Sequence, residues 1–358
     1  MRRSDEIGGS EFQEMRRMRI GDFGIKVGGL PAGPLNKISD VPGVTVGHCT
    51  VVSQTHNTGV TVVLPGPGNP FAEKRTAAAF VLNGFGKTAG LVQIDELGTL
   101  ETPIALTNTL NVGRVHDAMV EYMCRICQRD GISLTSVNPV VCECNDASLN
   151  DIRHRAVGEA QVFQAIESAK ADFEEGAVGC GRGMTCHGLK GGVGSASRVM
   201  TLDGEKYTLG VLVQSNHGRL QDLLLEGRPV GREIQRQLQE SAPDKGSCIV
   251  ILATDLPLSD RQLRRILKRC SVGLARLGSY IGHGSGEVFV GFSTANVLRL
   301  GETRDVLTRR ELNEERIDLP FRAAAEATEE AVLNSMVAAE QVTGFSGNTR
   351  HSLAEFLK

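Results

Sequence analysis

Ser247 is the residue whose surroundings most favour nucleophilic chemistry. It follows Gly246 and precedes a continuous apolar run, Cys248–Leu252, which is typical of a strand buried on both faces. Glycine permits a strained, close backbone approach, and the strand would hold the hydroxyl rigidly. The hydroxyl could therefore attack the carbonyl of Gly246. Hydrolysis of the resulting ester would leave Ser247 as a new N-terminus, whose amine can activate the neighbouring hydroxyl.

Ser285 and Glu287 are candidates to assist that hydroxyl. They lie two residues apart at the start of a predicted strand, Glu287–Phe292, so their side chains are expected on one face. A carboxylate beside a hydroxyl can orient it and polarise it toward a second nucleophile, as in a triad without histidine. A glycine-rich turn with two solvated polar residues has the same spacing, so the pattern leaves both interpretations open.

Polar side chains also follow two other predicted strands. Asn216 ends one of them, where its amide could donate to an oxyanion or occupy an ordinary turn. His217 has no acid paired with it and is predicted to be a loop residue. Glu143 and Asp146 follow the predicted strand Val140–Cys142, where they could bind a substrate ammonium or cap the turn.

Two further patterns carry weaker signals. The segment Gly188–Ser195 resembles a phosphate-binding loop but lacks its Gly-Lys-Ser/Thr ending and leads into a strand, so we expect it to line a tight cleft. Cys124 and Cys127 have C-x-x-C spacing, and Cys142 and Cys144 lie further on, but no matching second pair completes a zinc site. We expect Cys124 and Cys127 on an apolar helix face, and predict neither a metal nor a cofactor.

The composition is that of a soluble globular protein. The 358 residues, 41% hydrophobic and 23% charged, can bury a substantial core in one large domain or two ordinary ones. A net charge of −3 and the lack of tryptophan argue against a nucleic-acid partner. No apolar run approaches the roughly 20 residues of a membrane span, and we find no signal-peptide core. Nine scattered cysteines favour reduced thiols and a cytoplasmic protein.

Short strands mixed with helices predict a layered α/β or α+β body. The predicted strands are Gly59–Leu64, Ala77–Leu82, Pro103–Leu106, Val140–Cys142, the hairpin Ser197–Leu202 and Tyr207–Val213 around Asp203-Gly204, the run after Gly246, and Glu287–Phe292. The predicted helices are about Arg114–Gln128, Ala156–Ala171, Arg232–Gln239, a capped helix from Ser259 to Leu274, and Phe321–Glu340.

Several separated segments together resemble the self-cleaving aminopeptidases, the family that includes the L-aminopeptidase/D-amidase-esterases and the β-aminopeptidases. The resemblance extends from about Arg19 to the C-terminus, and agreement over many ordered segments is more specific than any one of them. These segments are Ser39–Val44, Thr102–Val112, Asn145–Ile152, Gly176–Arg198, Gln214–Gly218, Gly246–Pro257 and Gly284–Asn296.

The resemblance implies a four-layer αββα sandwich, similar to that of N-terminal-nucleophile hydrolases but with different connectivity. It implies that Ser247 is both the self-cleavage residue and the acylating nucleophile, assisted by Ser285 and Glu287. Asn216 would stabilise the oxyanion, and Glu143 would hold the free amino group of the substrate. Relatives assemble as homo-oligomers of cleaved heterodimers.

One position departs from the family pattern. Relatives often have tyrosine in the segment matching Asn145–Ile152, where this chain has Ser148. The hydroxyl is kept but its reach is lost, so we expect a different substrate preference or rate.

We therefore predict a serine aminopeptidase or amidase-esterase with a single catalytic domain, residues 19–358, cleaved between residues 246 and 247. It would release N-terminal residues from small peptides, amides or esters through an acyl-enzyme on Ser247. The polar first 18 residues are expected to be an extension outside the fold. Two alternatives are a self-cleaving acyltransferase of the same architecture, which uses threonine in place of Ser247, and an uncleaved, non-catalytic protein that binds a small molecule.

Overall fold

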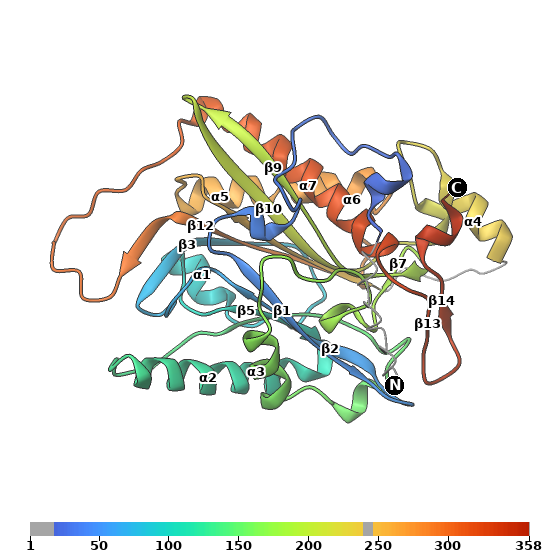
Figure 1. The fold of residues 1–358 in the computed structure, drawn as a ribbon, viewed down its shortest axis with the longest axis horizontal. Helices are drawn as coiled ribbons and strands as arrows, with labels where there is room; N and C mark the ends of the chain where they lie inside the picture. Colours follow the sequence, from blue (N-terminus) through green and yellow to red (C-terminus); the bar gives the residue numbers. More distant parts are fainter. Residues whose placement is uncertain (1–17, 239–245, 358) are drawn as a thin grey trace, which may run out of the picture.

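The computed structural model describes residues 18–238 and 246–357, which form four layers (Figure 1). Two β-sheets pack face to face, and helices cover the outer face of each sheet (Figure 1). The αββα sandwich implied by the family resemblance is therefore confirmed. The predicted N-terminal extension falls almost wholly on residues 1–17, which lie outside the described residues.

The smaller sheet has four strands and is covered by two helices. Its strands, in spatial order, are β1 (Thr45–Val52), β2 (Asn57–Leu64), β5 (Ile104–Asn108) and β6 (Val140–Cys144). The helices on its outer face are α2 (Val112–Arg129) and α3 (Glu159–Glu167).

The larger sheet has six strands and carries most of the predicted site. In spatial order they are β4 (Thr99–Leu100), β3 (Glu73–Gly84), β12 (Gly286–Arg299), β11 (Ser247–Thr254), β10 (Glu205–Asn216) and β9 (Gly192–Leu202). Its outer face is covered by α5 (Asp260–Leu267), α6 (Cys270–Arg276) and α7 (Asp318–Val337).

Smaller elements connect these layers. They are α1 (Leu91–Leu97), α4 (Val230–Leu238), the pair β7 (Thr185–Cys186) and β8 (Leu189–Lys190), and the pair β13 (Val342–Thr343) and β14 (Thr349–Arg350). None of the helices within residues 18–238 and 246–357 is long and apolar enough to cross a membrane.

Strand β11 explains why the sequence after Gly246 is continuously apolar. Cys248, Val250 and Leu252 belong to the core between the larger sheet and its helices. Ile249 and Ile251 belong to the core between the two sheets. Both faces of the strand are therefore buried, which is the environment that an uninterrupted apolar run indicates.

The strand order brings distant parts of the sequence to one edge of the larger sheet. Strand β10 runs antiparallel to β11, so the end of β10 lies beside the start of β11. Strand β12 runs parallel to β11, so their starts are neighbours as well. Three predicted site segments consequently meet at this edge.

Most predicted elements are confirmed, including the hairpin β9–β10 around Asp203 and Gly204. Both turn residues have positive φ, 51° and 81°, as a tight hairpin turn requires. The prediction of one continuous helix from Ser259 to Leu274 is wrong, because the structure has two separate helices there, α5 and α6. Gly273 brings α6 close to α7: a Cβ on Gly273 would lie 2.7 Å from the carbonyl oxygen of Ala325.

The helix predicted over Ala156–Ala171 is shorter than expected. Helix α3 ends at Glu167, and Lys170 then forms a β-bridge with Val46 on β1. Backbone pairing with the sheet thus replaces the last predicted helical turn. Strand β1 and helix α1 were not predicted, and Gln239 of the predicted helix Arg232–Gln239 lies outside the described residues.

Candidate active site

Ser247 is buried as the first residue of β11. It lies across the antiparallel ladder from Asn216 and across the parallel ladder from Gly286. The Ser247 Oγ accepts a hydrogen bond from the amide of Gly286 at 3.2 Å. The Ser247 carbonyl accepts one from the Cys144 thiol on the facing sheet, at 3.5 Å. The hydroxyl thus lies at the start of a buried strand, as its sequence context predicted, and three strand ends meet there.

Gly246 lies in a position that no side chain can occupy. A Cβ on Gly246 would lie 1.7 Å from the carbonyl oxygen of Asn216 and 2.6 Å from the Cα of His217. Because real Cβ atoms do not approach that closely, this close backbone contact requires glycine. The peptide bond between Gly246 and Ser247 is therefore packed against the end of β10.

Ser285 and Glu287 share one environment, as their spacing predicted. The Ser285 hydroxyl donates a hydrogen bond to Glu287 Oε1, and both residues are buried. The turn before them is fixed by Asn83 on β3, whose Nδ2 donates to the carbonyls of Ser285 at 2.5 Å and Gly282 at 3.0 Å. Gly286, between the two residues, donates its amide to Ser247. The alternative of two solvated turn residues is wrong.

The Asn216 side chain is held on both sides. Its Oδ1 accepts from the backbone amide of Thr185 at 2.8 Å, and its Nδ2 donates to the carbonyl of Asn145 at 3.0 Å. Asn216 is the last residue of β10, and its side chain is buried. Its amide plane is consequently fixed before any substrate arrives.

Glu143 reaches the same region from the smaller sheet. Its Oε1 accepts from the amide of Lys87 at 3.0 Å, and its Oε2 accepts from the Thr109 hydroxyl. The turn that holds this carboxylate also approaches the nucleophile, because the carbonyl oxygen of Phe85 lies 2.6 Å from the position of a Cβ on Gly286. A buried carboxylate therefore lies close to the three strand ends, on the opposite sheet.

Asp146 and His217 do not join this group as acid or base. The Asp146 carboxylate accepts from Thr58 at 2.6 Å, Asn108 at 3.0 Å and Asn150 at 3.0 Å, so it ties the loop after β6 to β2 and β5 instead of binding an ammonium. Burial raises the pKa of Asp146 to about 6. Burial, and the nearby His187, lower the pKa of His217 to about 3, so its imidazole stays neutral.

Lys190 is a positioning residue that the sequence did not reveal. Its fully buried ammonium donates to the carbonyls of Gly181, Met184 and Gly191 at 2.8–2.9 Å. These bonds close the glycine-rich segment around Thr185, which in turn holds Asn216. Backbone atoms pack closely against Gly191, Gly192 and Gly194 of the segment Gly188–Ser195, and the cleft expected there stays a prediction.

Two other sequence features have a defined place. Ser148, which departs from the family pattern, lies beside the site, because its Oγ is 3.1 Å from the Thr185 hydroxyl. The prediction that Cys124 faces the core is wrong. Met123, Ile126 and Cys127 belong to the buried stripe of α2, and Cys124 lies one position outside it, exposed to solvent.

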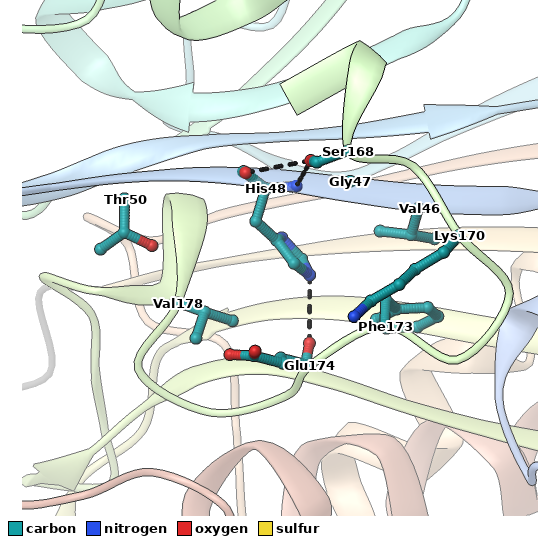
Figure 2. Close-up of a pocket in the computed structure, with 9 residues that line it drawn as sticks. All are labelled: Val46, Gly47, His48, Thr50, Ser168, Lys170, Phe173, Glu174 and Val178. Atoms are coloured by element: carbon teal, nitrogen blue, oxygen red, sulfur yellow. Dashed lines mark hydrogen bonds between the residues drawn. The ribbon is translucent and has the colours of Figure 1, made fainter. Parts of the chain in front are cut away.

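A cavity of about 230 Å³ lies elsewhere, between β1 and the loop after α3 (Figure 2). Both ring nitrogens of His48 are engaged there: Nδ1 lies 2.9 Å from the Thr61 hydroxyl, and Nε2 3.0 Å from the Glu174 carbonyl oxygen. None of the sequence-predicted site residues lines this cavity. The candidate active site is therefore the group of strand ends around Ser247.

Comparison with known proteins identifies the family. The model of peptidase family S58 matches residues 36–350. The chain belongs to this family. A curated relative, the β-peptidyl aminopeptidase BapA of Sphingosinicella xenopeptidilytica, is 38% identical over 349 residues, which cover 91% of this chain and 86% of the relative.

Solved structures of similar proteins share the fold of this chain. The L-aminopeptidase D-Ala-esterase/amidase from Ochrobactrum anthropi, described as a variant of the Ntn hydrolase fold, has a TM-score of 0.87 and 35% identity, covering 95% of this chain and 96% of that one. A protein from Pyrococcus horikoshii has a TM-score of 0.89 and 46% identity, covering 95% and 98%. The chain is thus an S58 aminopeptidase with a variant Ntn hydrolase fold.

Proposed function

We propose that this S58 aminopeptidase is made as a precursor that cleaves itself between Gly246 and Ser247. The Ser247 hydroxyl would attack the Gly246 carbonyl carbon, and the C–N bond would break as the proton passes from Oγ to the departing nitrogen. Water would then hydrolyse the ester, leaving a carboxylate on Gly246 and a free amine on Ser247. The observation that carries this proposal is the packing of the Gly246–Ser247 bond against Asn216, with Ser247 Oγ fixed by Gly286.

In turnover, the Ser247 hydroxyl would attack the first amide or ester carbonyl of a small substrate that carries a free amino group. Ser285 and Glu287 would polarise the nucleophile and relay its proton. Asn216 would donate to the oxyanion, and Glu143 would hold the substrate ammonium. Water would then hydrolyse the acyl-enzyme ester and release the acyl group from Ser247. Fixed positioning of this kind can supply about 7–11 kcal/mol of the barrier.

The buried carboxylate of Glu143 supports a substrate with a positive amino terminus. An incoming ammonium would meet this carboxylate in a region of low dielectric. The names of the relatives, a β-peptidyl aminopeptidase and an L-aminopeptidase D-Ala-esterase/amidase, favour small peptides, amides or esters as substrates.

The two cleaved parts would remain in one catalytic domain, residues 19–358. Strands on both sides of the cleavage point, β10 and β11, pair with each other in the larger sheet, so the fragments share a core. By the family resemblance, such heterodimers would assemble into a homo-oligomer. The buried thiols favour a cytoplasmic setting.

Intact-mass measurement of freshly purified protein under denaturing conditions tests the proposal. Scaling 38.4 kDa by 246/358 residues gives expected fragments of about 26 and about 12 kDa, the smaller beginning at Ser247. The Ser247→Ala variant is the matched control and should stay at 38.4 kDa. A wild-type chain that persists whole on incubation would rule out self-processing and favour the uncleaved alternative.

An assay that compares water with an added amine as acyl acceptor separates hydrolysis from acyl transfer. Membership of a peptidase family favours hydrolysis, and Ser247 stands where the acyltransferases have threonine. Products transferred mainly to the amine would overturn this assignment.

A further inference from the structure

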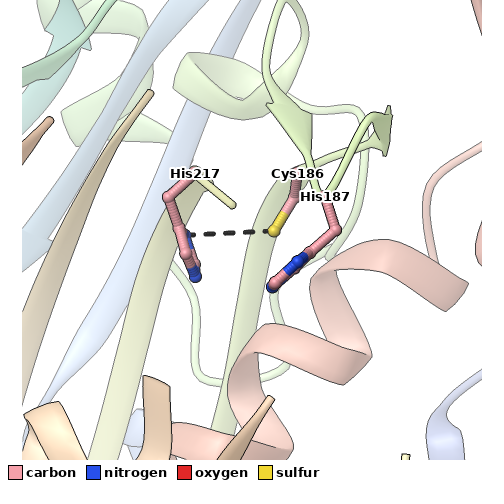
Figure 3. A group of neighbouring side chains, drawn as sticks. All are labelled: Cys186, His187 and His217. Carbon is pink, nitrogen blue, oxygen red and sulfur yellow. Dashed lines mark hydrogen bonds between the residues drawn. The ribbon is translucent and has the colours of Figure 1, made fainter. Parts of the chain in front are cut away.

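Two histidines and a cysteine converge in the interior (Figure 3), and one of them, His217, directly follows Asn216 in the chain. Cys186 ends β7, His187 follows it, and His217 follows β10. All three are buried, and one potential ligand atom from each lies within 4.8 Å of the others. The two imidazole rings contact each other edge to face, with their centroids 5.4 Å apart, and the Cys186 sulfur lies beside them (Figure 3). The mechanism proposed above uses none of these side chains.

The donor atoms are oriented as metal ligands usually are. His187 Nδ1 lies 3.2 Å from the carbonyl oxygen of Arg219, and because a carbonyl only accepts, Nδ1 carries the proton. The lone pair of His187 is therefore on Nε2. Metal-ligating histidines typically donate their other ring nitrogen to such a backbone carbonyl. Gly218 leaves room for this ring, because a Cβ there would lie 2.5 Å from His187 Nδ1.

The separations suit a single ion. Cys186 Sγ lies 3.9 Å from His217 Nδ1. Metal–sulfur and metal–nitrogen bonds of about 2.3 and about 2.0 Å allow one ion to bridge a sulfur and a nitrogen that are about 4 Å apart. Among the described residues, no hydrogen-bond partner is found for His217 Nε2, although the atom is buried. An ion bound at His217 Nδ1 would lie between this ring and the thiolate, and an ion bound at Nε2 would give that nitrogen a partner.

The charge and the chemical softness of the three ligands determine which metal ions the site favours. Thiolate and imidazole ligands favour Cu⁺ and Zn²⁺ over hard cations. With one thiolate and two neutral imidazoles, a monovalent ion gives a neutral centre, whereas Zn²⁺ leaves one uncompensated positive charge. Burying a net charge is costly, so the neutral centre is favoured.

We propose that Cys186, His187 and His217 form a three-coordinate site for one thiophilic monovalent metal ion, Cu⁺. On binding, the Cys186 thiol releases its proton to solvent and the thiolate forms the metal–sulfur bond, while both imidazoles bind as neutral ligands. No electron is transferred.

The site would join two segments that position Asn216. His187 already donates its amide to the His217 carbonyl at 2.7 Å, and Thr185 donates to Asn216 Oδ1. A metal ion would add a covalent-strength link between β7 and the end of β10, directly behind the Gly246–Ser247 bond. We therefore expect the ion to raise the thermal unfolding temperature.

Anaerobic Cu⁺ titration against a chromophoric Cu⁺ chelator tests the site. It should be made on Ser247→Ala protein, refolded with and without the metal because the ligands are buried. In this background binding does not depend on activity, so failure of the metal site and failure of the proposed enzyme mechanism are distinguished. We expect one Cu⁺ per chain, and tighter binding than for Zn²⁺ in parallel.

Cys186→Ser and His217→Gln should abolish this binding, whereas Cys124→Ser, which removes the exposed thiol of α2, should leave it unchanged. Circular dichroism checks that each variant is folded. X-ray absorption of the Cu⁺-loaded protein needs no variant, and should show one sulfur and two nitrogen ligands. A spectrum with two or more sulfurs, loss of binding in Cys124→Ser, no stoichiometric binding, or a preference for Zn²⁺ would each overturn the proposal.

Discussion

Asn216, the last residue of β10, lies directly across the antiparallel ladder from Ser247, the first residue of β11. Its Oδ1 is fixed by the Thr185 amide and its Nδ2 by the Asn145 carbonyl. Among the described residues, Asn145 is the one acceptor of Nδ2, so the second hydrogen of this nitrogen can donate to an oxyanion. A donor fixed before substrate binds needs no reorganisation during the reaction.

Asn216→Asp should separate this donor from the structural role of the residue. The carboxylate keeps the acceptor for Thr185 and has nearly the same shape, but it cannot donate and it repels an oxyanion. We expect turnover to fall about 100- to 1000-fold, as for the loss of one oxyanion donor. Steady-state kinetics on the cleaved protein, with Asn216→Ala in parallel, would measure this. Unchanged turnover in both variants would remove Asn216 from the mechanism.

Gly246→Ala should arrest the precursor. The added Cβ would fall 1.7 Å from the Asn216 carbonyl oxygen, so the scissile bond must shift away from Ser247 Oγ. Overpacking of this kind costs about 1–3 kcal/mol, and misplaced reacting atoms slow the attack further. Mass spectrometry over time after purification should show persistence of the 38.4 kDa chain.

Gly284→Ala is the matched control for that variant. Gly284 lies in the turn before Ser285, but a Cβ there would have no neighbour within 4 Å. This variant should cleave at the wild-type rate. Equal cleavage of both alanine variants would show that the close contact at Gly246 does not matter for processing.

The sequence predicted the site residues of the larger sheet because each lies at the visible end of an apolar run. Ser247, Asn216 and Glu287 are adjacent to strands whose patterns are clear locally. Their meeting could not be predicted from those patterns, because it depends on β10 being antiparallel and β12 parallel to β11. The family resemblance, and not the strand patterns, grouped these residues into one predicted site.

Features built by tertiary contact alone were missed. The Phe85–Lys87 turn holds Glu143 through a backbone amide, which no sequence pattern marks, although flanking glycines indicate a turn. In the sequence, Lys190 belongs to the segment Gly188–Ser195, which resembles a phosphate-binding loop but lacks its ending. Only its hydrogen bonds to three backbone carbonyls show that its side chain holds the local structure together. Cys186 and His217 are 31 residues apart, so their proximity was equally hidden.

Ser285→Ala and Glu287→Gln should each lower turnover by about 100- to 10,000-fold, the range expected for a positioned acid–base group. The Ser285 hydroxyl donates to Glu287, so each variant removes the same polarised unit. The double variant should therefore be hardly worse than either single variant. Single-turnover acylation rates with an ester substrate would measure the effect.

Ser293→Ala provides a control on the same strand. Its hydroxyl is also buried, but it donates to the Leu256 carbonyl at 2.5 Å, far along β12 from Ser247. This variant should lose stability without losing acylation. A similar acylation loss at both serines would indicate general damage to β12 rather than a catalytic role for Ser285.

Glu143→Gln should weaken the recognition of a free amino terminus. A hydrogen bond to a charged group is worth about 1.5–3 kcal/mol, so kcat/KM should fall about 10- to 100-fold for substrates with an ammonium. The amide still accepts from Lys87, so the turn at residues 85–87 should be kept. N-acetylated ester analogues, which lack the charge, should react equally with both proteins. A matching loss for the acetylated analogues would contradict the assigned role.

The buried carboxyl of Asp146 should make stability depend on pH in an unusual direction. In the folded protein, burial is the main cause that raises the pKa of this carboxyl from 3.8 to about 6. The native state therefore binds the proton more tightly than the unfolded chain does. The stabilisation is therefore fully present below about pH 4 and is lost as pH rises through about 6. A shift of about two units corresponds to about 3 kcal/mol.

Urea unfolding of Ser247→Ala protein, with and without Asp146→Asn, isolates this contribution because both chains stay uncleaved. The difference in unfolding free energy between the two proteins should change by about 2–3 kcal/mol between about pH 4 and about pH 7, in the sense that the Asp146 protein loses more stability as pH rises. Other titrating groups cancel in that difference. A pH-independent difference would mean that Thr58, Asn108 and Asn150 hold the carboxylate ionised, and that burial does not dominate its titration.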